Sequence, residues 1–237
     1  MNRGRLFRYA FVKSIPVMMG YVFLGLAFGI LLNSELGLSW VWALYMSAVI
    51  YAGSMEFALI PLLGAVTPLP TVAIMTLLVN SRHLFYGLSF VEPYREMGRL
   101  RPYMIYSLTD ETYSVLCSCA GDPEVNADRH IVYFWISLMH HIYWTVGSVL
   151  GTILGASISL DTTGIDFAMT ALFVVILVDQ IRGGGRDAWQ CAAVGLCVGL
   201  VFLIALGADR FLLPTLAVTV FALLLMDLLN AGKEARA

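Results

Sequence analysis

The stretch FALIPLLGAVTPLPTVAIMTLLVNS, residues 57–81, contains no Asp, Glu, Lys or Arg. A run of this length exceeds the roughly 18 apolar residues that mark a candidate membrane-spanning helix. Further runs lack the same four residue types, at 14–34, 36–55, 130–160, 188–208 and 211–226. The sequence therefore predicts an all-α integral membrane protein, a polytopic helical bundle of about seven to eight hydrophobic segments. We place these segments near 15–32, 38–62, 68–90, 103–120, 130–157, 164–181, 188–207 and 211–229, joined by short loops.

The composition indicates the same class. Hydrophobic residues make up 59% of the 237 residues and charged residues 13%, whereas soluble domains average about 45–50% and about 25%. The net charge of −2 leaves no basic surface for nucleic acid. The sequence has neither zinc-ligand spacing nor a Gly-rich phosphate loop, so we expect a lipid bilayer around the chain and no metal or cofactor within it.

Two similar stretches suggest an internal duplication. Gly25-Leu-Ala-Phe-Gly29 is followed by a Gly-Leu-Ser turn, and Gly151-Thr-Ile-Leu-Gly155 by a Gly-Ile-Asp turn. We expect a single transmembrane domain, 1–237, built from a first repeat half, 1–120, and a second, 121–237, as in many secondary transporters. Chance similarity is the alternative, since glycines four residues apart also allow close helix packing.

The distribution of Lys and Arg discriminates between two topologies. If each hydrophobic segment crosses once from a cytoplasmic N-terminus, the arginines of the loop 91–102 lie outside, against the positive-inside rule. If instead 38–62 and 164–181 enter the membrane and return, only Arg129 and Arg210 of the loop residues lie outside. This second topology, with broken or re-entrant helices, makes the two halves inverted repeats, and it is the one we prefer.

Polar groups interrupt the apolar pattern directly after residue 81. Arg82 and His83 stand there before the apolar sequence resumes with Leu-Phe-Tyr-Gly. Asn80 and His83 share a helix face, because they are three residues apart. Arg82 can bind a carboxylate through two hydrogen bonds, and His83 can change charge near neutral pH. Alternatively, the span ends near Asn80 and Arg82 extends into the headgroups.

A second interruption is the stretch Tyr51-Ala-Gly-Ser-Met-Glu-Phe57. Gly53 and Ser54 weaken a helix, and Glu56 is the lone acid between residues 36 and 91. We predict a broken helix here, whose second half presents the positive end of its dipole to a ligand. The alternative is a tight helix contact with Glu56 near the membrane interface.

A third interruption consists of two adjacent acids, Asp110 and Glu111, within an otherwise apolar segment. The alternative interpretation is a helix N-terminus, with Thr109 as the cap and both acids in the first turn. The pair His140-His141 also lies in an apolar segment. Hydrogen-bonded packing is the simpler interpretation of this pair, because adjacent residues cannot ligate a metal from one helix face.

These charges could balance one another inside the membrane. Arg82 could pair with Glu56, Asp110 or Glu111, which lowers the cost of burying each charge and leaves one acid free to exchange a proton. A wet, charge-lined centre in an apolar bundle is the layout of a transporter. A channel or ion carrier lined by the same residues is the competing class, and an intramembrane enzyme is disfavoured because no paired nucleophile and base is evident.

Three motifs resemble those of the AzlC family, the large subunits of bacterial branched-chain amino acid exporters. Val79-Asn-Ser-Arg-His-Leu-Phe-Tyr-Gly87 resembles that family's Val-Asn-(Ala/Ser)-Arg-His-Leu-Leu-Tyr-Gly. The stretch 51–57 is similar to its Ala-Gly-(Ala/Ser)-x-Gln-Phe, and 107–113 to its Leu-Thr-Asp-Glu-x-(Phe/Tyr). One departure is Glu56, where the family often has Gln.

The resemblance implies a secondary transporter that exports leucine, isoleucine, valine or analogues across the bacterial inner membrane. It also implies proton coupling and a small membrane partner subunit of the AzlD type. In the mechanism that fits, Arg82 or the broken-helix N-terminus at 52–54 takes the substrate carboxylate. Glu56, Asp110 or Glu111 takes the ammonium group, and His83 or one of the acids cycles a proton.

Overall fold

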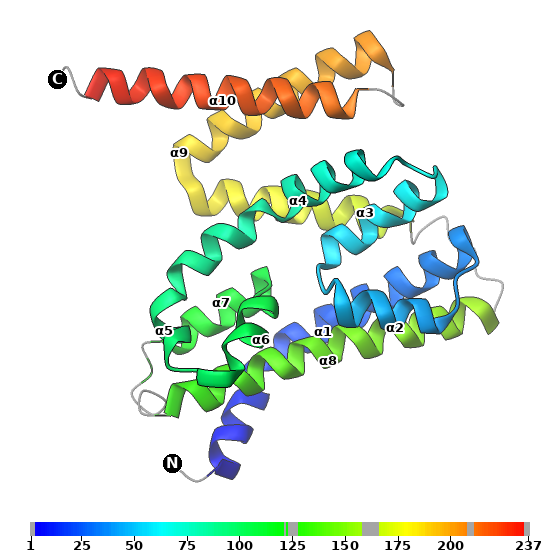
Figure 1. Cartoon of the computed structure of the whole chain (residues 1–237), viewed down its shortest axis with the longest axis vertical. Coiled ribbons are helices and arrows are strands. Elements are labelled where there is room, and N and C mark those ends of the chain that lie inside the picture. The colour runs from blue at the N-terminus through cyan, green and yellow to red at the C-terminus, as the bar shows by residue number, and fades with distance from the viewer. Residues whose placement is uncertain (1–2, 121, 123–127, 158–165, 208–210, 235–237) are drawn as a thin grey trace. The chain divides into compact units, whose positions relative to one another are not determined.

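The computed structural model describes residues 3–120, 122, 128–157, 166–207 and 211–234, and every regular element among them is helical, as predicted. The chain divides into two compact units, 1–170 and 171–237, which are described separately. The helices of the first unit are α1 (Arg3–Leu36), α2 (Trp40–Val49), α3 (Gly53–Gly64), α4 (Leu69–Ser89), α5 (Val91–Arg95), η1 (Gly98–Leu100), α6 (Arg101–Tyr106), α7 (Asp110–Cys119) and α8 (Arg129–Ser157). Helix α9 (Asp166–Leu206) belongs to both units, and α10 (Leu212–Glu234) to the second (Figure 1).

Two described helical stretches are long and apolar enough to cross a membrane, Arg3–Leu36 and Ala188–Leu206. Shorter apolar helical stretches occur at Trp40–Val49, Gly53–Gly64, Leu69–Ser81 and Ala217–Met226. Helices α2 and α3 contain 10 and 12 residues, so at about 1.5 Å per residue neither reaches across a hydrocarbon core of about 30 Å. The predicted break in segment 38–62 is therefore present.

The predicted segments 164–181 and 188–207 differ from the structure. Helix α9 continues through residues 182–187 without a break, and residues 164–165 lie outside the described part of the chain. The charged and glycine-containing sequence between the two segments was interpreted as a loop. Glycine costs only about 1 kcal/mol relative to alanine in a helix, so such a stretch can remain helical.

The first unit is organised around α1 and α8, which lie side by side (Figure 1). Their contact is made by glycines. A Cβ atom on Gly25 would lie 2.9 Å from the backbone N of Ser148, and one on Gly147 would lie 2.9 Å from the carbonyl O of Val22. The backbones therefore touch directly, so the two glycine pairs serve close helix packing, as the alternative to a duplication expects, and the duplication itself stays a prediction.

Helices α1 and α8 run parallel to each other. Gly25 meets Gly147, and one turn later Gly29 meets Gly151, so position numbers rise together along both helices. Inverted halves would require the two corresponding helices to run in opposite directions. The predicted inversion is therefore wrong for this pair of helices.

One end of the first unit gathers three segments of the chain. The Tyr9 hydroxyl donates to Asp122 over 2.7 Å, and Arg129 donates to Glu96 through Nη2 over 2.8 Å. Leu6 packs in the same buried cluster as Tyr94 and Met97. The N-terminal part of α1, the loop 91–102 and the start of α8 thus share this end, which we call the basic end because Arg3, Arg5, Arg8, Arg95, Arg99, Arg101 and Arg129 lie in these three segments.

The basic end corrects the predicted topology. Both topologies considered above place the loop 91–102 and Arg129 on opposite sides of the membrane, and the Glu96–Arg129 ion pair contradicts both. The cause lies in segment 103–120. It forms two short helices, α6 and α7, that leave the basic end and return to it, because α7 is followed by Asp122, which is bonded to Tyr9.

Large apolar side chains cover much of the outer surface of the chain. In the first unit Phe23 is 69% exposed and Leu77 66% exposed. Exposed apolar groups of this size and number would be costly in water. They suit a surface that faces lipid tails.

Candidate functional site

The break between α2 and α3 places Glu56 in the interior. Tyr51, at the break, is buried and adopts a φ of 45°, a left-handed conformation that is unusual for a residue with a side chain. Helix α3 then begins at Gly53, where a Cβ atom would lie 2.9 Å from the ring of Trp144. A glycine is thus needed for Trp144 of α8 to pack against the start of α3.

Glu56 is fully buried and is held by three hydrogen-bond donors. Its Oε1 accepts from Trp144 Nε1 over 3.0 Å and from the backbone N–H of Ala52 over 3.2 Å, and its Oε2 accepts from the Ser47 hydroxyl over 3.3 Å. The carboxylate lies in the first turn of α3, where the helix dipole favours negative charge. The tight helix contact of the alternative interpretation is present where Gly53 meets Trp144, and the depth of Glu56 in the membrane stays a prediction.

A second polar cluster surrounds the start of α7. Thr109 caps the helix by accepting from the backbone N–H of Thr112 over 3.3 Å, with Asp110 and Glu111 in the first turn. The helix-cap interpretation of these two acids is therefore confirmed. The same residues also enter a wider network, because the Tyr21 hydroxyl of α1 donates to Glu111 over 2.7 Å.

This network extends to α8. The hydroxyl groups of Tyr21 and Thr109 are 2.6 Å apart, and those of Thr109 and Thr112 are 3.0 Å apart. Thr112 Oγ1 lies 2.9 Å from Nδ1 of His140, which is fully buried. The adjacent His141 is not part of this network and instead contacts the Tyr103 hydroxyl and the Ser47 carbonyl. Hydrogen-bonded packing of the two histidines is confirmed, and no group of three or more metal-ligating side chains occurs among the described residues.

Two aromatic rings join the two clusters. Tyr21 and Trp144 meet edge to face with ring centroids 5.6 Å apart. Tyr21 holds Glu111 and Trp144 holds Glu56, so the two acids lie on either side of this ring pair. The N-termini of two short helices, α3 and α7, therefore converge on the middle of the α1–α8 pair, each with acidic residues in its first turn.

The residues of the 79–87 motif lie in α4 and are only partly described. Asn80 Oδ1 is buried without a hydrogen-bond partner among the residues that the structure describes, and His83 Nδ1 contacts the Asn80 carbonyl over 3.1 Å. The backbone of Arg82 is helical, but its side chain lies outside the described residues. The described contacts of Asn80 and His83 do not include Glu56 or Glu111, so their convergence with the two acids stays a prediction.

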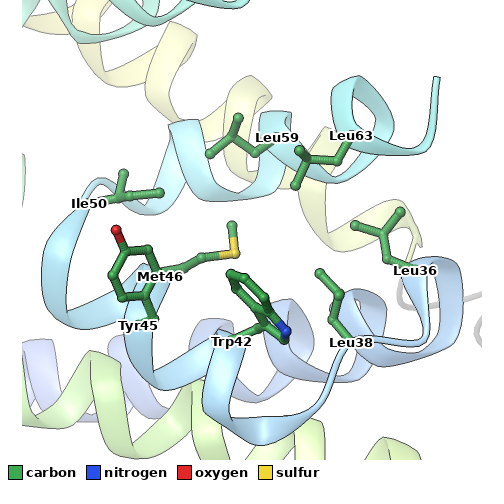
Figure 2. Close-up of a pocket in the computed structure, with 8 residues that line it drawn as sticks. All are labelled: Leu36, Leu38, Trp42, Tyr45, Met46, Ile50, Leu59 and Leu63. Atoms are coloured by element: carbon green, nitrogen blue, oxygen red, sulfur yellow. The ribbon is translucent and has the colours of Figure 1, made fainter. Parts of the chain in front are cut away.

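His83 lines a cavity of about 250 Å³ near the basic end. The cavity also contacts Tyr94 and Arg101, and its remaining walls are largely apolar: Gly87, Leu88, Phe90, Val91, Ile105 and Leu108. A larger apolar pocket of about 450 Å³ lies between α2 and α3 (Figure 2). Figure 2 shows Trp42 and Met46 of α2 facing Leu59 and Leu63 of α3 across it. Both cavities offer aliphatic surface near the broken helices.

Sequence reasoning did not identify the partners that hold the two acids. Tyr21, Ser47 and Trp144 were not singled out, although each is a polar group within an apolar run. Thr112 was quoted only as part of a motif.

Comparisons with known proteins give a consistent result. The family model described as AzlC protein matches residues 16–158. The branched-chain amino acid transport protein AzlC of Bacillus subtilis is 38% identical over 211 residues, covering 89% of this chain and 81% of that protein. A membrane protein of Helicobacter pylori is 37% identical over 223 residues, covering 93% and 95%. Inner membrane protein YgaZ of Escherichia coli is 26% identical over 198 residues, covering 79% and 78%. No solved structure matches the chain.

Proposed function

Because the chain belongs to the AzlC family, we propose that it exports leucine, isoleucine, valine or analogues across the bacterial inner membrane. It is an all-α membrane protein and a homologue of a branched-chain amino acid transport protein. The observation that carries the proposal is the identity of 38% over 89% of the chain to that Bacillus subtilis protein. Transport is proposed in place of catalysis.

The proposed substrate site lies where the two short helices converge. Half-helix N-termini carry partial positive charge, which suits a substrate carboxylate. The start of α3 at Gly53 and Ser54, together with Arg82, would take this group. Asp110 or Glu111 would take the ammonium group. Glu56 already accepts from three protein donors, so its proposed role is to hold the break open for the ligand.

Coupling to protons is the proposed driving force. The sequence contains no phosphate-binding loop, and the two clusters contain titratable groups at membrane depth. Such groups are typical of proton relays in transporters. Entry of protons in exchange for an amino acid would drive export.

The proposed orientation puts the basic end in the cytoplasm. Cytoplasmic loops carry an excess of Lys and Arg, and the seven arginines of the basic end lie in three segments that meet there. The N-terminus would then be cytoplasmic. A small membrane subunit of the AzlD type is the proposed partner, and the exposed apolar surface of the chain offers room for it.

An export panel tests the function. Cells loaded with each of the twenty amino acids are followed with and without this chain and a co-expressed small subunit. We expect faster efflux of leucine, isoleucine or valine when the chain is present. Unchanged efflux of all amino acids in both settings would contradict the proposal.

Counterflow separates a carrier from a channel. Vesicles loaded with unlabelled leucine should concentrate labelled leucine from outside, because a carrier exchanges one molecule for another. An open pore would let the label equilibrate without concentrating it.

A further inference from the structure

An unbroken series of hydrogen bonds runs from Glu111 to His140 through three hydroxyl groups. Glu111 Oε2 to Tyr21 is 2.7 Å, Tyr21 to Thr109 is 2.6 Å, Thr109 to Thr112 is 3.0 Å, and Thr112 to His140 Nδ1 is 2.9 Å. The series joins a carboxylate at one end to an imidazole at the other. Every member between them is a hydroxyl group that can both donate and accept.

The burial of the series isolates it from water. Tyr21 is 5% exposed and Thr109 7%, while Thr112 and His140 are fully buried. Glu111 alone is partly exposed. At the inner end, Nε2 of His140 is buried with no hydrogen-bond partner among the described residues. Leaving a buried polar atom unpaired costs about 1–3 kcal/mol, so hydrogen-bonded packing leaves this ring nitrogen unsatisfied.

Each hydroxyl group carries one proton, and this restricts the series to two orientations. With Glu111 protonated, each group donates toward His140, and the imidazole accepts at Nδ1 and carries its proton at Nε2. With Glu111 ionised, each group donates toward Glu111, and the imidazole donates from Nδ1. The geometry fits Thr109 as donor to Thr112, as in the first orientation, and Tyr21 as donor to Glu111, as in the second, while the Tyr21–Thr109 contact fits either direction.

We propose that Glu111, Tyr21, Thr109, Thr112 and His140 form a proton relay that carries the coupling proton of the proposed transport cycle. A proton leaves Glu111 for the Tyr21 oxygen as the Tyr21 proton passes to Thr109, that of Thr109 to Thr112, and that of Thr112 to Nδ1. The result is a carboxylate and an imidazolium, and Nε2 releases its proton when a step of the transport cycle opens His140 to water. Reprotonation of Glu111, rotation of the hydroxyl groups and exchange of the remaining imidazole proton from Nδ1 to Nε2 through that water restore the first orientation.

The surroundings of His140 contain few other titratable groups. Tyr21 faces it from α1 with ring centroids 5.8 Å apart, and Tyr143 lies on its own helix at 6.4 Å. Thr112 faces it from α7 and leads to Glu111. One turn along α8, Trp144 separates it from Glu56 of α3. No described Lys or Arg has a recorded contact with His140, so its charge responds mainly to the relay.

This inference rests on the proposed function, because it gives the relay a role in amino acid export. Glu111 is also a proposed ligand of the substrate ammonium group. The Glu111 carboxylate can hold a proton or the substrate ammonium group, but not both at once. Proton entry and amino acid exit would therefore alternate. The relay thus supplies a path by which one site serves both events.

The test compares driven transport with exchange in inside-out membrane vesicles. Thr112→Val removes one hydroxyl group with little change in shape. Proton-driven leucine accumulation should fall by about a hundredfold, the usual contribution of a positioned acid or base. Leucine exchange without a proton gradient should stay within about twofold of wild type, because exchange needs no net proton transfer. Tyr21→Phe should likewise lower driven transport, and Thr112→Ser should restore it.

The control is Tyr9→Phe. Tyr9 lies on the same helix as Tyr21 and also donates to a carboxylate over 2.7 Å, that of Asp122. It lies outside the relay, so the variant should retain both activities. Driven transport at wild-type level in Thr112→Val and Tyr21→Phe would overturn the relay. Absence of leucine exchange in the wild type would instead overturn the proposed function.

A second measurement does not depend on transport. The nitrogen NMR spectrum of histidine-labelled protein reports which ring nitrogen of His140 carries the proton, with His140→Gln used to assign its signals among the four histidines. In Glu111→Gln the amide N–H group donates to the Tyr21 oxygen, so each hydroxyl group must donate toward His140. The proton of His140 should therefore move from Nδ1 to Nε2. The added change Thr112→Val should abolish this response. An unchanged His140 signal in Glu111→Gln would overturn the relay.

Discussion

At the scale of single residues, Glu56 shows how one buried carboxylate is accommodated. Its two oxygens accept from Trp144, Ala52 and Ser47, which come from α8, the break and α2. A Gln side chain fits the same surroundings, because its oxygen can accept from Trp144 and Ala52 while its nitrogen donates to Ser47. This explains how Glu and Gln can both occupy the position.

The contrast between two substitutions tests this account. Glu56→Leu leaves the N–H groups of Trp144 and Ala52 without an acceptor, at about 1–3 kcal/mol each. We expect the thermal unfolding midpoint in detergent to fall by roughly 4 °C or more. Glu56→Gln should stay near the wild-type midpoint. Equal midpoints for Glu56→Leu and the wild type would contradict the assigned hydrogen bonds.

Substitutions of Arg82 test transport activity, whereas those of Glu56 test stability. A hydrogen bond to a charged group contributes about 1.5–3 kcal/mol, so Arg82→Ala should lower leucine export roughly tenfold or more. Arg82→Lys keeps the charge but loses the planar fork and should restore only part of the rate. Efflux is compared at equal protein levels in the membrane. Wild-type efflux from Arg82→Ala would remove this residue from the mechanism.

The two acids were identifiable from sequence, but their partners were not. Glu56 and Glu111 stand out because charge is rare in apolar segments. Tyr21 and Trp144 are ordinary in a membrane helix, and only the parallel contact of α1 and α8 brings them together. Contacts between residues about ninety positions apart depend on the tertiary fold, which the spacing within one helix does not contain.

At the scale of elements, the glycine contact between α1 and α8 determines the architecture of the first unit. A Cβ atom on Gly151 would overlap the carbonyl of Leu26, so no rotamer change can relieve the clash. Gly20 lies on α1 as well, but a Cβ atom there would meet nothing within 4 Å. The two positions therefore form a matched pair for a test.

Gly151→Ala should prevent normal assembly of the unit, whereas Gly20→Ala should be tolerated. Alanine favours a helix over glycine by about 1 kcal/mol, so the second variant should be as stable as the wild type or more so. The measurement is the yield of monodisperse protein after detergent extraction. The prediction fails if Gly151→Ala gives the same yield as Gly20→Ala.

Helix boundaries were predictable from sequence where a glycine or a charged residue interrupts an apolar run. The break before α3 follows from Gly53 and from a charge in an apolar run, and it is present. The break between α6 and α7 follows from the helix-cap interpretation of Thr109, Asp110 and Glu111. The return of segment 103–120 to the basic end does not follow from sequence, because the segment is long enough to span. The continuity of α9 was missed for the opposite reason, since its charged stretch was interpreted as a loop.

At the scale of the whole molecule, the basic end predicts which positions share one side of the membrane. Arg99 lies in the loop 91–102 and His130 at the start of α8, and both are exposed. Ser39 lies between α1 and α2. Since the Glu96–Arg129 ion pair joins the first two segments, we expect Arg99→Cys and His130→Cys to behave alike in a labelling experiment.

The experiment uses single-cysteine variants in a background without Cys117, Cys119, Cys191 and Cys197, treated with a membrane-impermeant thiol reagent. In intact cells Arg99→Cys and His130→Cys should resist labelling, and Ser39→Cys should react. After permeabilisation all three should react. Opposite behaviour of Arg99→Cys and His130→Cys would show that segment 103–120 crosses the membrane.

The backbone contact of α1 with α8 also limits how the carrier can move. Two helices that interlock without intervening side chains cannot slide or tilt against each other without a clash, so they form a fixed spine. If the chain is the proposed exporter, opening toward one side and then the other would come from the short helices that lean on that spine. A covalent crosslink between the spine helices should leave transport intact, while one that ties α3 or α7 to the spine should stop it.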